Sequence, residues 1–507
     1  MWNMEDNREE WGSKLGFILA AIGSAVGLGN IWRFPYLVYT NGGGAFLVPY
    51  FIAIITAAIP LLILEYGIGH KYRGSTPLAL GRANKRAEWL GWWPTINAFI
   101  ILTYYSMILS WAIKYFTLSF TKSWGDNTNS YFYNDFLKLS DSPFKFSGII
   151  IPVLVGIAIL WFANWFICFR GIKGGIEKVN KILLPLLVVI MIIIVVKGVT
   201  LEGSTVGLNK LFTPDWNKVK DPSVWIAAYG QVFFSLSVGM GIMVTYSSYL
   251  PKKTDINNSA FMTAFANSGF EFLCAIGVFS ILGFMSVAQG VPLDEVVSGG
   301  IGLAFIVFPK VFSLMGIWGN ILGALFFACL IFAGLTSSVS LLEAVSAPII
   351  DKFGISRKKV VTSICIVGFI LSIAYSTRAG LYLLDIIDNF INNYGIVVVG
   401  LLEAIVIGWI VKPKTIREHT NSISYFRIGK WWDILIKYIT PAILLVMVIS
   451  SLINEFRHPY GGYSTGALIA YGWCIIGIGI IGALLISRRP WKNKDLVYNE
   501  SEEVDNE

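Results

Sequence analysis

Twelve apolar stretches, each long enough to cross a bilayer, follow one another along this chain and constrain its fold more than any other feature. A spanning helix needs about 20 apolar residues. Lipid offers the backbone no hydrogen-bond partner, so such stretches fold as helices. We place them at residues 14–39, 44–70, 91–121, 147–168, 176–197, 223–249, 257–289, 317–350, 358–376, 380–411, 433–456 and 465–487. The sequence predicts an all-α, polytopic membrane protein with about twelve transmembrane helices.

The distribution of charge predicts how these helices cross the membrane. Only 14% of residues are charged, against about 25% in a soluble domain. The net charge of +8 comes from basic residues that cluster in alternate loops, which marks those loops as cytoplasmic. Both termini then face the cytoplasm, and the expected location is the inner, or plasma, membrane of the cell. No basic domain remains outside the spans, so we expect no nucleic acid partner.

Two of the spans contain residues that weaken a helix. The first contains Gly23-Ser-Ala-Val-Gly-Leu-Gly-Asn30, and the sixth contains Ser235-Leu-Ser-Val-Gly-Met-Gly241. Glycine costs a helix about 1 kcal/mol relative to alanine, and a helix that opens in lipid exposes carbonyls that need a partner such as a cation. Close helix packing is the alternative explanation for either run alone. Their pairing favours two broken helices.

The spacing of the two breaks predicts an internal repeat. They lie five spans apart, and an odd number of spans makes the second copy enter the membrane from the opposite side. We therefore expect two inverted five-helix repeats whose breaks meet near the bilayer midplane. The predicted segments are a cytoplasmic N-terminal segment (1–13), the repeats (14–197 and 223–411), helices 11 and 12 (433–487), and a cytoplasmic tail (488–507).

Five segments of the chain together resemble a known family. They are Trp11 to Pro35, Asn41-Gly-Gly-Gly-Ala-Phe46, Trp225-Ile-Ala-Ala-Tyr-Gly-Gln231, Gly302 to Pro309, and Ala333-Gly-Leu-Thr-Ser-Ser338. These motifs are similar to the signature of the neurotransmitter:sodium symporter family, and the similarity covers nearly the whole chain. The resemblance implies sodium-coupled uptake of an amino acid by alternating access, as in prokaryotic members of that family.

The resemblance also implies two sodium sites built from oxygen donors, which suit a hard cation. The first would use the Ala25 carbonyl, Asn30, Ser235, Asn267 and the substrate carboxylate. The second would use carbonyls of Gly23, Val26 and Ala333 and the hydroxyls of Thr336 and Ser337. The residues alone leave simpler explanations open. Buried amides bond between helices, and adjacent hydroxyls bond back to the preceding helical turn.

The substrate class is inferred from a missing charge. Family members that carry monoamines resemble one another in having an aspartate where this chain has Gly27. Without that acid the substrate must bring its own carboxylate, as an amino acid does. The pocket is expected to be apolar or small, which favours a neutral, hydrophobic amino acid, aliphatic or aromatic. The resemblance implies that it is lined by Ala25, Leu28, Gly29, Ile101, Tyr105, Phe234, Ser235, Ser237, Met240, Ser337 and Leu341.

Ionisable residues in or near the spans are usually functional. The resemblance matches Arg33 and Asp388 to an outer gate, and Arg8 and Asp351, with Tyr249, to an inner gate. Glu271 stands where chloride-dependent members resemble each other in having a small polar residue. A fixed carboxylate there replaces the anion, so we expect transport without chloride.

Two other classes of protein remain as alternatives. An amino-acid-responsive sensor or a channel can share this architecture, because fold does not determine function. An enzyme is not expected, since the chain has no HExxH or cysteine–histidine motif. The expected partners are an amino acid, sodium ions (two), the lipid bilayer and, at most, a second copy of the chain in a homodimer.

Overall fold

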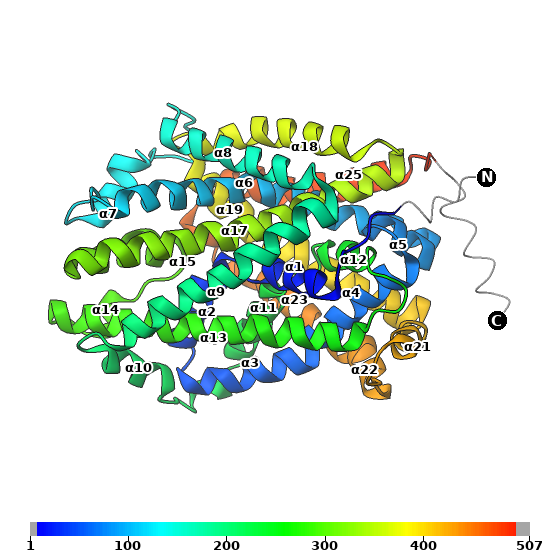
Figure 1. Cartoon of the computed structure of the whole chain (residues 1–507), viewed down its shortest axis with the longest axis horizontal. Coiled ribbons are helices and arrows are strands. Elements are labelled where there is room, and N and C mark those ends of the chain that lie inside the picture. Colours follow the sequence, from blue (N-terminus) through cyan, green and yellow to red (C-terminus); the bar gives the residue numbers. More distant parts are fainter. Residues whose placement is uncertain (1–7, 493–507) are drawn as a thin grey trace.

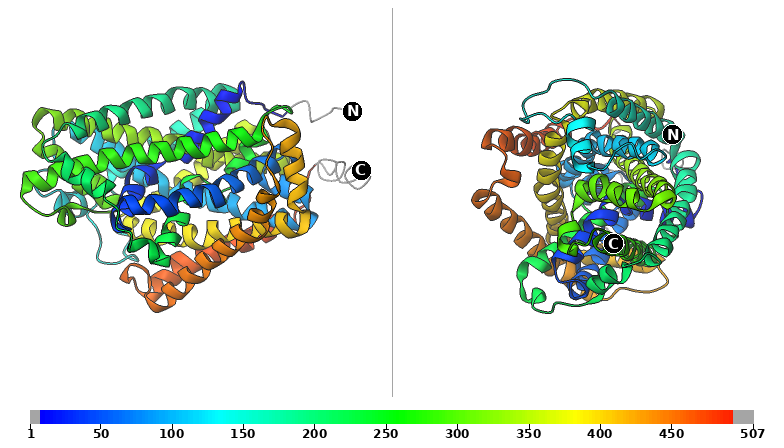
Figure 2. Two further views of the ribbon diagram at one scale, coloured as in Figure 1. Left: turned by 90° about the horizontal axis from the view of Figure 1, so that it is seen from below. Right: turned by 90° about the vertical axis from the view of Figure 1, so that its left-hand side faces the viewer.

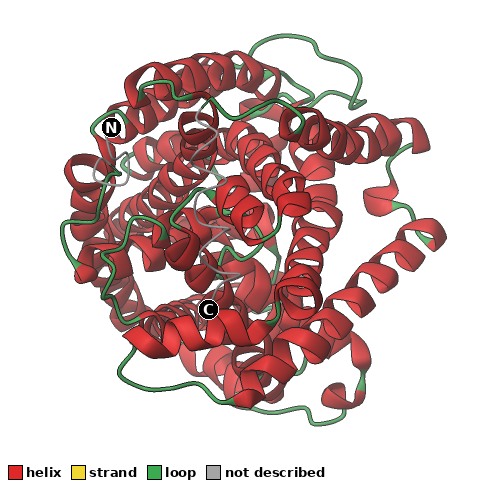
Figure 3. Ribbon diagram, turned by 90° about the vertical axis from the view of Figure 1, so that its right-hand side faces the viewer, coloured by secondary structure: helices red, strands yellow, loops and turns green. Residues whose placement is uncertain are grey.

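The computed structural model of the protein describes residues 8–492 as helices joined by turns and loops (Figure 1, Figure 3). Within that range the only β-type pairings are two isolated bridges, Gly43 with Pro214 and Ile149 with Thr377. Most of the long helices run along one common axis. In the end view of Figure 2 they form a bundle whose last two spans, coloured orange and red, lie at its edge.

Within residues 8–492, ten continuous helical stretches are long and apolar enough to cross a membrane. Three of them are single α-helices: α8 (Ile151–Cys168), α13 (Ile256–Gln289) and α17 (Gly316–Phe353). Three contain one named α-helix within a longer helical stretch: Lys85–Ser119 with α6 (Glu88–Ser119), Ile172–Val199 with α9 (Lys178–Val199), and Arg357–Ser376 with α18 (Arg357–Ser372). The last four contain two α-helices each: Gly44–Tyr72 with α3 (Leu47–Ala53) and α4 (Ile59–Tyr72), Gly380–Val411 with α19 (Gly380–Phe390) and α20 (Val397–Ile405), Lys430–Gly462 with α22 (Lys430–Ile434) and α23 (Thr440–Arg457), and Thr465–Ser487 with α24 (Thr465–Ala467) and α25 (Cys474–Ser487).

The first and sixth spans complete the set as pairs of shorter helices. The first consists of α1 (Lys14–Ala25) and α2 (Leu28–Thr40), and the sixth of α11 (Pro222–Ser235) and α12 (Ile242–Ser247). This confirms the prediction of an all-helical protein with about twelve membrane spans. The remaining helices lie between spans and are α5 (Thr76–Ala83), α7 (Thr128–Ser130), α10 (Ser204–Phe212), α14 (Leu293–Val296), α15 (Gly300–Gly302), α16 (Phe308–Leu314) and α21 (Pro413–Ile423).

The first break lies where the glycine run predicts it. Helix α1 ends at Ala25, α2 begins at Leu28, and their axes differ in direction by 54°. Gly27 precedes α2 in an extended conformation, and its N–H donates to the Asn30 side chain over 3.0 Å. The bend ends the hydrogen-bond ladder of α1, so its last carbonyls have no partner within the helix.

The second break also lies where predicted, between Ser235 and Ile242. Ser237, Gly239 and Gly241 all have positive φ angles, of 54°, 75° and 72°. Glycine adopts that conformation freely, whereas serine does not. Ser237 is held in it by a 3.1 Å hydrogen bond from its hydroxyl to the Ser24 carbonyl. The second break therefore touches the last turn of α1, directly before the first break.

Both ends of the described chain lie at one end of the bundle, called the inner end here. The Arg8 guanidinium is 3.2 Å from the Asp351 carboxylate, and the Lys492 N–H donates to the neighbouring Lys352 carbonyl. This end carries the loops that the charge pattern marks as cytoplasmic. The predicted cytoplasmic termini fall in part on residues 1–7 and 493–507, which lie outside the described residues.

Candidate functional site

The two breaks border a cavity of about 730 Å³ in the middle of the bundle. Every residue that the sequence analysis assigned to the substrate pocket lines it, from Ala25, Leu28 and Gly29 on the first span to Leu341 on the eighth. The cavity continues past Arg33 and Asp388 to Gly299–Gly302, Tyr460 and Tyr463, which lie between spans or at the ends of spans. It therefore extends from the breaks toward the outer end of the molecule.

Gly27 lies directly beside this cavity. A β-carbon added to Gly27 would be 3.3 Å from the Ser337 hydroxyl oxygen and 3.6 Å from the Tyr105 hydroxyl oxygen. A side chain at this position would occupy the space in front of both hydroxyls. An aspartate at position 27, as in the family members that carry monoamines, would therefore project into the cavity, and this chain has no such carboxylate there.

The side chains proposed for the first sodium site form one hydrogen-bonded chain. The Asn30 amide donates to Asn267 over 2.7 Å, and the Asn267 amide donates to Ser235 over 3.0 Å. All three side chains are buried. They present neutral oxygen donors beside the end of α1, a set whose chemistry fits a sodium ion. An ion bound there would have to compete with these internal hydrogen bonds.

Gly23, Ala333, Thr336 and Ser337, four of the five residues proposed for the second sodium site, also meet in space. The Ser337 hydroxyl donates to the carbonyls of Ser24 and Ala333, at 3.2 and 3.0 Å, and lies 3.5 Å from that of Gly23. The Thr336 hydroxyl donates to Ala333 over 2.9 Å. Both hydroxyls thus make the local bonds typical of membrane helices. They also bring α17 against the last turn of α1, where carbonyl oxygens collect.

Sequence reasoning missed Asn180, on α9. Its Oδ1 atom is buried and has no hydrogen-bond partner among the residues that the structure describes. A β-carbon added to Gly23 would lie only 2.2 Å from that atom, so glycine is required at position 23 for this close approach. A buried asparagine in an apolar span was the signal that could have identified it.

Sequence reasoning also missed Glu65, on α4 in the second span. Its carboxylate accepts a 2.7 Å hydrogen bond from the Gly239 N–H, within the second break. Acids inside membrane spans are rare and usually functional. This signal was present in the sequence, but its partner could not be identified without the structure.

Glu271 is fully buried on α13. It accepts hydrogen bonds from the Tyr50 hydroxyl and, over 2.6 Å, from the Gln231 amide. The carboxyl group is thus held between the second, sixth and seventh spans.

The two residues of the predicted outer gate line the cavity but do not form an ion pair with each other in the described structure. The Arg33 guanidinium lies over the Phe234 ring, 5.0 Å from its centre. Asp388 accepts a 2.7 Å hydrogen bond from Tyr104 instead. The cavity is therefore not closed by this pair at its outer side.

The two residues of the predicted inner gate are in contact. Arg8 pairs with Asp351, donates to the Ser248 hydroxyl over 2.9 Å, and lies 4.9 Å from the centre of the Tyr249 ring. Burial disfavours the charged guanidinium, but the attraction of Asp351 outweighs it, so the pKa of Arg8 is raised above its usual value. The inner end is closed while the outer end is open.

Two further residues of the inner end were missed. Arg357 makes two hydrogen bonds to the buried Glu343 carboxylate, of 2.6 and 2.9 Å. Glu343 also accepts from the Tyr249 hydroxyl over 2.7 Å. Forked arginine–carboxylate pairs are strong and directional. The Arg357–Glu343 pair therefore fixes the Tyr249 ring, over which the Arg8 guanidinium lies.

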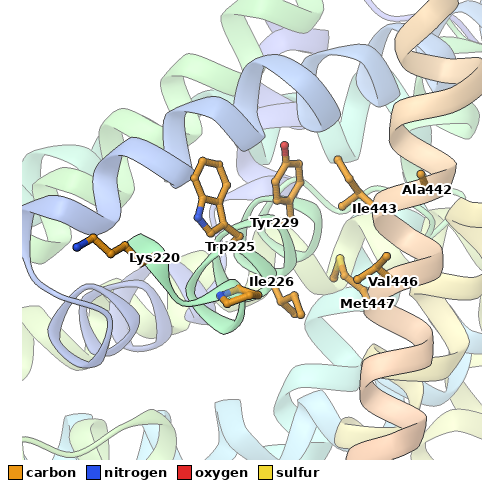
Figure 4. A pocket seen from close by; sticks show the side chains of 9 residues that line it. Lys220, Trp225, Ile226, Tyr229, Ala442, Ile443, Val446 and Met447 are labelled. Carbon is orange, nitrogen blue, oxygen red and sulfur yellow. The ribbon is translucent and has the colours of Figure 1, made fainter. Parts of the chain in front are cut away.

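A second, smaller cavity of about 430 Å³ lies between α11 and α23 (Figure 4). Apolar side chains such as Ile226, Ile443 and Met447 line it, with Trp225 and Tyr229 beside them. None of the predicted site residues borders it. The central cavity is the candidate functional site.

Comparison with known proteins identifies the family. The model of the sodium:neurotransmitter symporter family matches residues 8–134 and 125–489. An uncharacterized sodium-dependent transporter of Methanocaldococcus jannaschii is 42% identical, over 95% of this chain and 98% of its own. The sodium-dependent dopamine transporter of Caenorhabditis elegans is 32% identical, over 94% of this chain and 85% of its own.

A solved structure is also similar. The crystal structure of MhsT in complex with L-phenylalanine matches with a TM-score of 0.75 and 34% identity, over 88% of this chain and all of the other. The matched proteins are transporters, in agreement with the expectation that the chain is not an enzyme. The chain, a multi-pass membrane protein, belongs to the sodium:neurotransmitter symporter family.

Proposed function

We propose that the protein is a symporter that couples the uptake of a neutral, hydrophobic amino acid to sodium ions, two per cycle. The observation that carries the proposal is the open space beside Gly27. There a substrate carboxylate can reach the Tyr105 hydroxyl and the first-sodium donors without meeting an acidic side chain. The similarity to a transporter crystallised with L-phenylalanine supports it.

The charges around the cavity support a neutral substrate. Its charged lining residues are Arg33, Asp385 and Asp388. Asp385 already accepts from Tyr460 and Tyr463, at 2.9 and 2.8 Å, and Asp388 from Tyr104. These acids are already hydrogen-bonded, and neither is among the residues assigned to the substrate pocket, which are all uncharged. A neutral substrate is therefore proposed.

Alternating access follows from the gates. Substrate enters from the open outer end, and closure of the outer side above Phe234 would then precede separation of Arg8 from Asp351 at the inner end. We propose that the protein lies in the plasma membrane with both termini cytoplasmic, and that the two five-helix repeats, 14–197 and 223–411, move against each other around the breaks.

Chloride independence is a separate part of the proposal. A related protein, the sodium- and chloride-dependent glycine transporter 1 of Xenopus laevis, is 28% identical over 91% of this chain. We assign the role of the anion in this chain to the buried Glu271 carboxylate. Glu271→Ser should make uptake depend on chloride, whereas Glu271→Asp should not. Chloride-independent uptake by active Glu271→Ser would contradict the assignment.

The test of the main proposal is uptake of labelled amino acids by proteoliposomes that contain the purified protein. We expect leucine or phenylalanine to accumulate only with an inward sodium gradient, and lysine and glutamate not to accumulate. A sensor would bind an amino acid without accumulating it, and a channel would let it equilibrate without concentrating it. Lack of sodium-driven accumulation for every amino acid tested would overturn the proposal.

A further inference from the structure

Two buried carboxyl groups that belong to none of the sites above lie behind the second break. Glu65 is on α4 and Glu403 is on α20, and their exposed fractions are 0% and 1%. One Glu65 oxygen accepts the Gly239 N–H, as described above. The other Glu65 oxygen and both oxygens of Glu403 have no hydrogen-bond partner in the described structure. Buried polar atoms normally have a hydrogen-bond partner, so three buried carboxyl oxygens without one require an explanation.

The packing of the tenth span places Glu403 on the side that faces the break. Ile396, Gly400 and Glu403 follow one another at helical spacings of four and three residues, so they share one face. A β-carbon on Gly239 would lie 2.9 Å from the Ile396 carbonyl oxygen, and one on Gly400 would lie 2.5 Å from the Phe233 ring. Glu403 thus belongs to the face that packs on the broken sixth span, and it is close enough to Glu65 for a charge on one to act on the other.

No basic side chain forms an ion pair with either carboxyl in the described part of the chain. Several charged and titratable groups on the neighbouring elements are engaged elsewhere. They are Tyr66 with Thr263, His70 with His419, Tyr246 with Ser340, Tyr394 with the Ser451 carbonyl, Arg417 with Asp433, and Lys437 over the Trp409 ring.

Two carboxylates in this environment cannot both remain ionised. An unpaired charge in an apolar interior is costly, and two like charges at one site raise that cost further. Carboxyl pairs in such settings share one proton. Hydrogen bonding to an N–H favours the ionised form, and only Glu65 has such a donor, so the proton belongs on Glu403.

We propose that Glu65 and Glu403 form a proton-binding site, with one proton held on Glu403 and Glu65 ionised against the Gly239 N–H. Gly239 lies between Ser237 and Met240, which line the central cavity. A movement of the break that lengthens the bond from Gly239 to Glu65 makes Glu65 a better proton acceptor. Occupancy of the central cavity and of the proton site are therefore linked, and linkage of this kind is reciprocal.

Infrared spectroscopy of the purified full-length protein at neutral pH tests the site directly, because a protonated carboxyl group has its own carbonyl stretching band. We expect a band from a buried acid that is present in the wild type and lost in Glu403→Gln. The matched control is Glu455→Gln, on α23, which should keep the band. An unchanged band in Glu403→Gln would overturn the proposal.

Folding of the variants is part of the same test. Glutamine has the shape of a protonated glutamate, so Glu403→Gln should fold and melt within a few degrees of the wild type. A Glu403→Gln protein that fails to fold would count against a protonated Glu403. Glu403→Asp, which keeps the acid, should retain a band at a shifted position.

The link to the central cavity rests on the proposed function and has its own readout. Addition of sodium and leucine, or whichever amino acid is shown to bind, should shift the band in the wild type and in Glu455→Gln. A band that is present but does not move on substrate binding would refute the linkage and leave the proton site standing. Absence of any amino acid binding would instead refute the proposed function.

Discussion

Gly27 faces Tyr105 across the central cavity, and a β-carbon on Gly27 would lie 3.6 Å from the Tyr105 hydroxyl. Gly27→Asp would place a carboxylate where we expect the carboxylate of the substrate. Two like charges at one site repel each other, so leucine or phenylalanine binding should weaken at least tenfold, equivalent to about 1.4 kcal/mol. Equilibrium binding of the labelled amino acid in detergent measures this directly.

Gly27→Ala is the matched control for that prediction. It adds the same β-carbon, 3.3 Å from the Ser337 hydroxyl, without the charge. A contact at that distance requires a small local shift, and binding should weaken less than in Gly27→Asp. Equal losses in the two variants would mean that space, and not charge, excludes the acid.

A second prediction concerns Gly23 and Asn180. Gly23→Ala would bring a β-carbon to 2.2 Å from the Asn180 Oδ1 atom, so the backbone or the amide must move. Because the Gly23 carbonyl is proposed as a sodium ligand, the sodium concentration for half-maximal amino acid binding should rise at least tenfold. Adding Asn180→Ala should remove the clash and restore most of the affinity.

The control for this pair is Gly269→Ala on α13, where an added β-carbon would meet nothing within 4 Å. It should leave the sodium dependence unchanged. If Gly23→Ala alone behaves like Gly269→Ala, the Gly23 carbonyl is not at an ion site.

A third prediction concerns the closed inner end. The side chains of Arg8 and Asp351 are only 16% and 13% exposed, so their pair is more stabilising than one on the surface. Arg8→Ala should favour opening of the inner end by about 1–2 kcal/mol, a factor of 5–30 in the ratio of open to closed states. A cysteine introduced at the buried Ser340, in a Cys474→Ser background, should react correspondingly faster with a thiol reagent.

Lys145→Ala is the matched control, because its pair with Asp141 is 61% and 92% exposed. Exposed pairs contribute little, so labelling at position 340 should keep its rate. A rate that is also unchanged in Arg8→Ala would mean that other contacts hold the inner end closed.

A fourth prediction concerns acid stability and His419, which lies on α21 outside the spans. Its Nε2 atom is 2.9 Å from Nδ1 of His70, and Nε2 of His70 is 3.0 Å from the Pro251 carbonyl oxygen. A carbonyl only accepts, so a neutral His70 donates from Nε2 and accepts at Nδ1 from His419. Burial, with repulsion from Lys71 and from His70 when that ring is protonated, lowers the pKa of His419 to about 3.

The direction of the pH effect follows from that value. In the unfolded chain a histidine titrates near 6.5, so the unfolded state takes up the proton first as the pH falls. The stabilising contribution is therefore complete above about pH 6.5 and is lost as the pH falls from there toward about 3, by up to about 1.4 kcal/mol per pH unit. Thermal melts across this range should show a smaller acid loss in His419→Gln, which keeps a hydrogen-bond donor. Equal slopes in both proteins would contradict the assignment.

Local properties of the sequence predict much of the fold and part of the site. The apolar stretches predict the spans, because each helix must satisfy its own backbone in lipid. The glycine runs at 23–30 and 235–241 predict both breaks, because helix propensity is a local property. Residues within or beside these runs, such as Asn30 and Ser235, could therefore be assigned to the site.

What the sequence alone determined is the class of protein, the positions of the two breaks and the residue types around them. Only the tertiary structure decided that Glu65 binds Gly239, that Asn180 reaches Gly23, and that Arg8 is paired with Asp351 while Arg33 and Asp388 are apart. The physical reason is that periodicity and composition report on a residue's own helix. Contacts between spans far apart in the chain depend instead on how whole helices pack, and no local pattern encodes that packing.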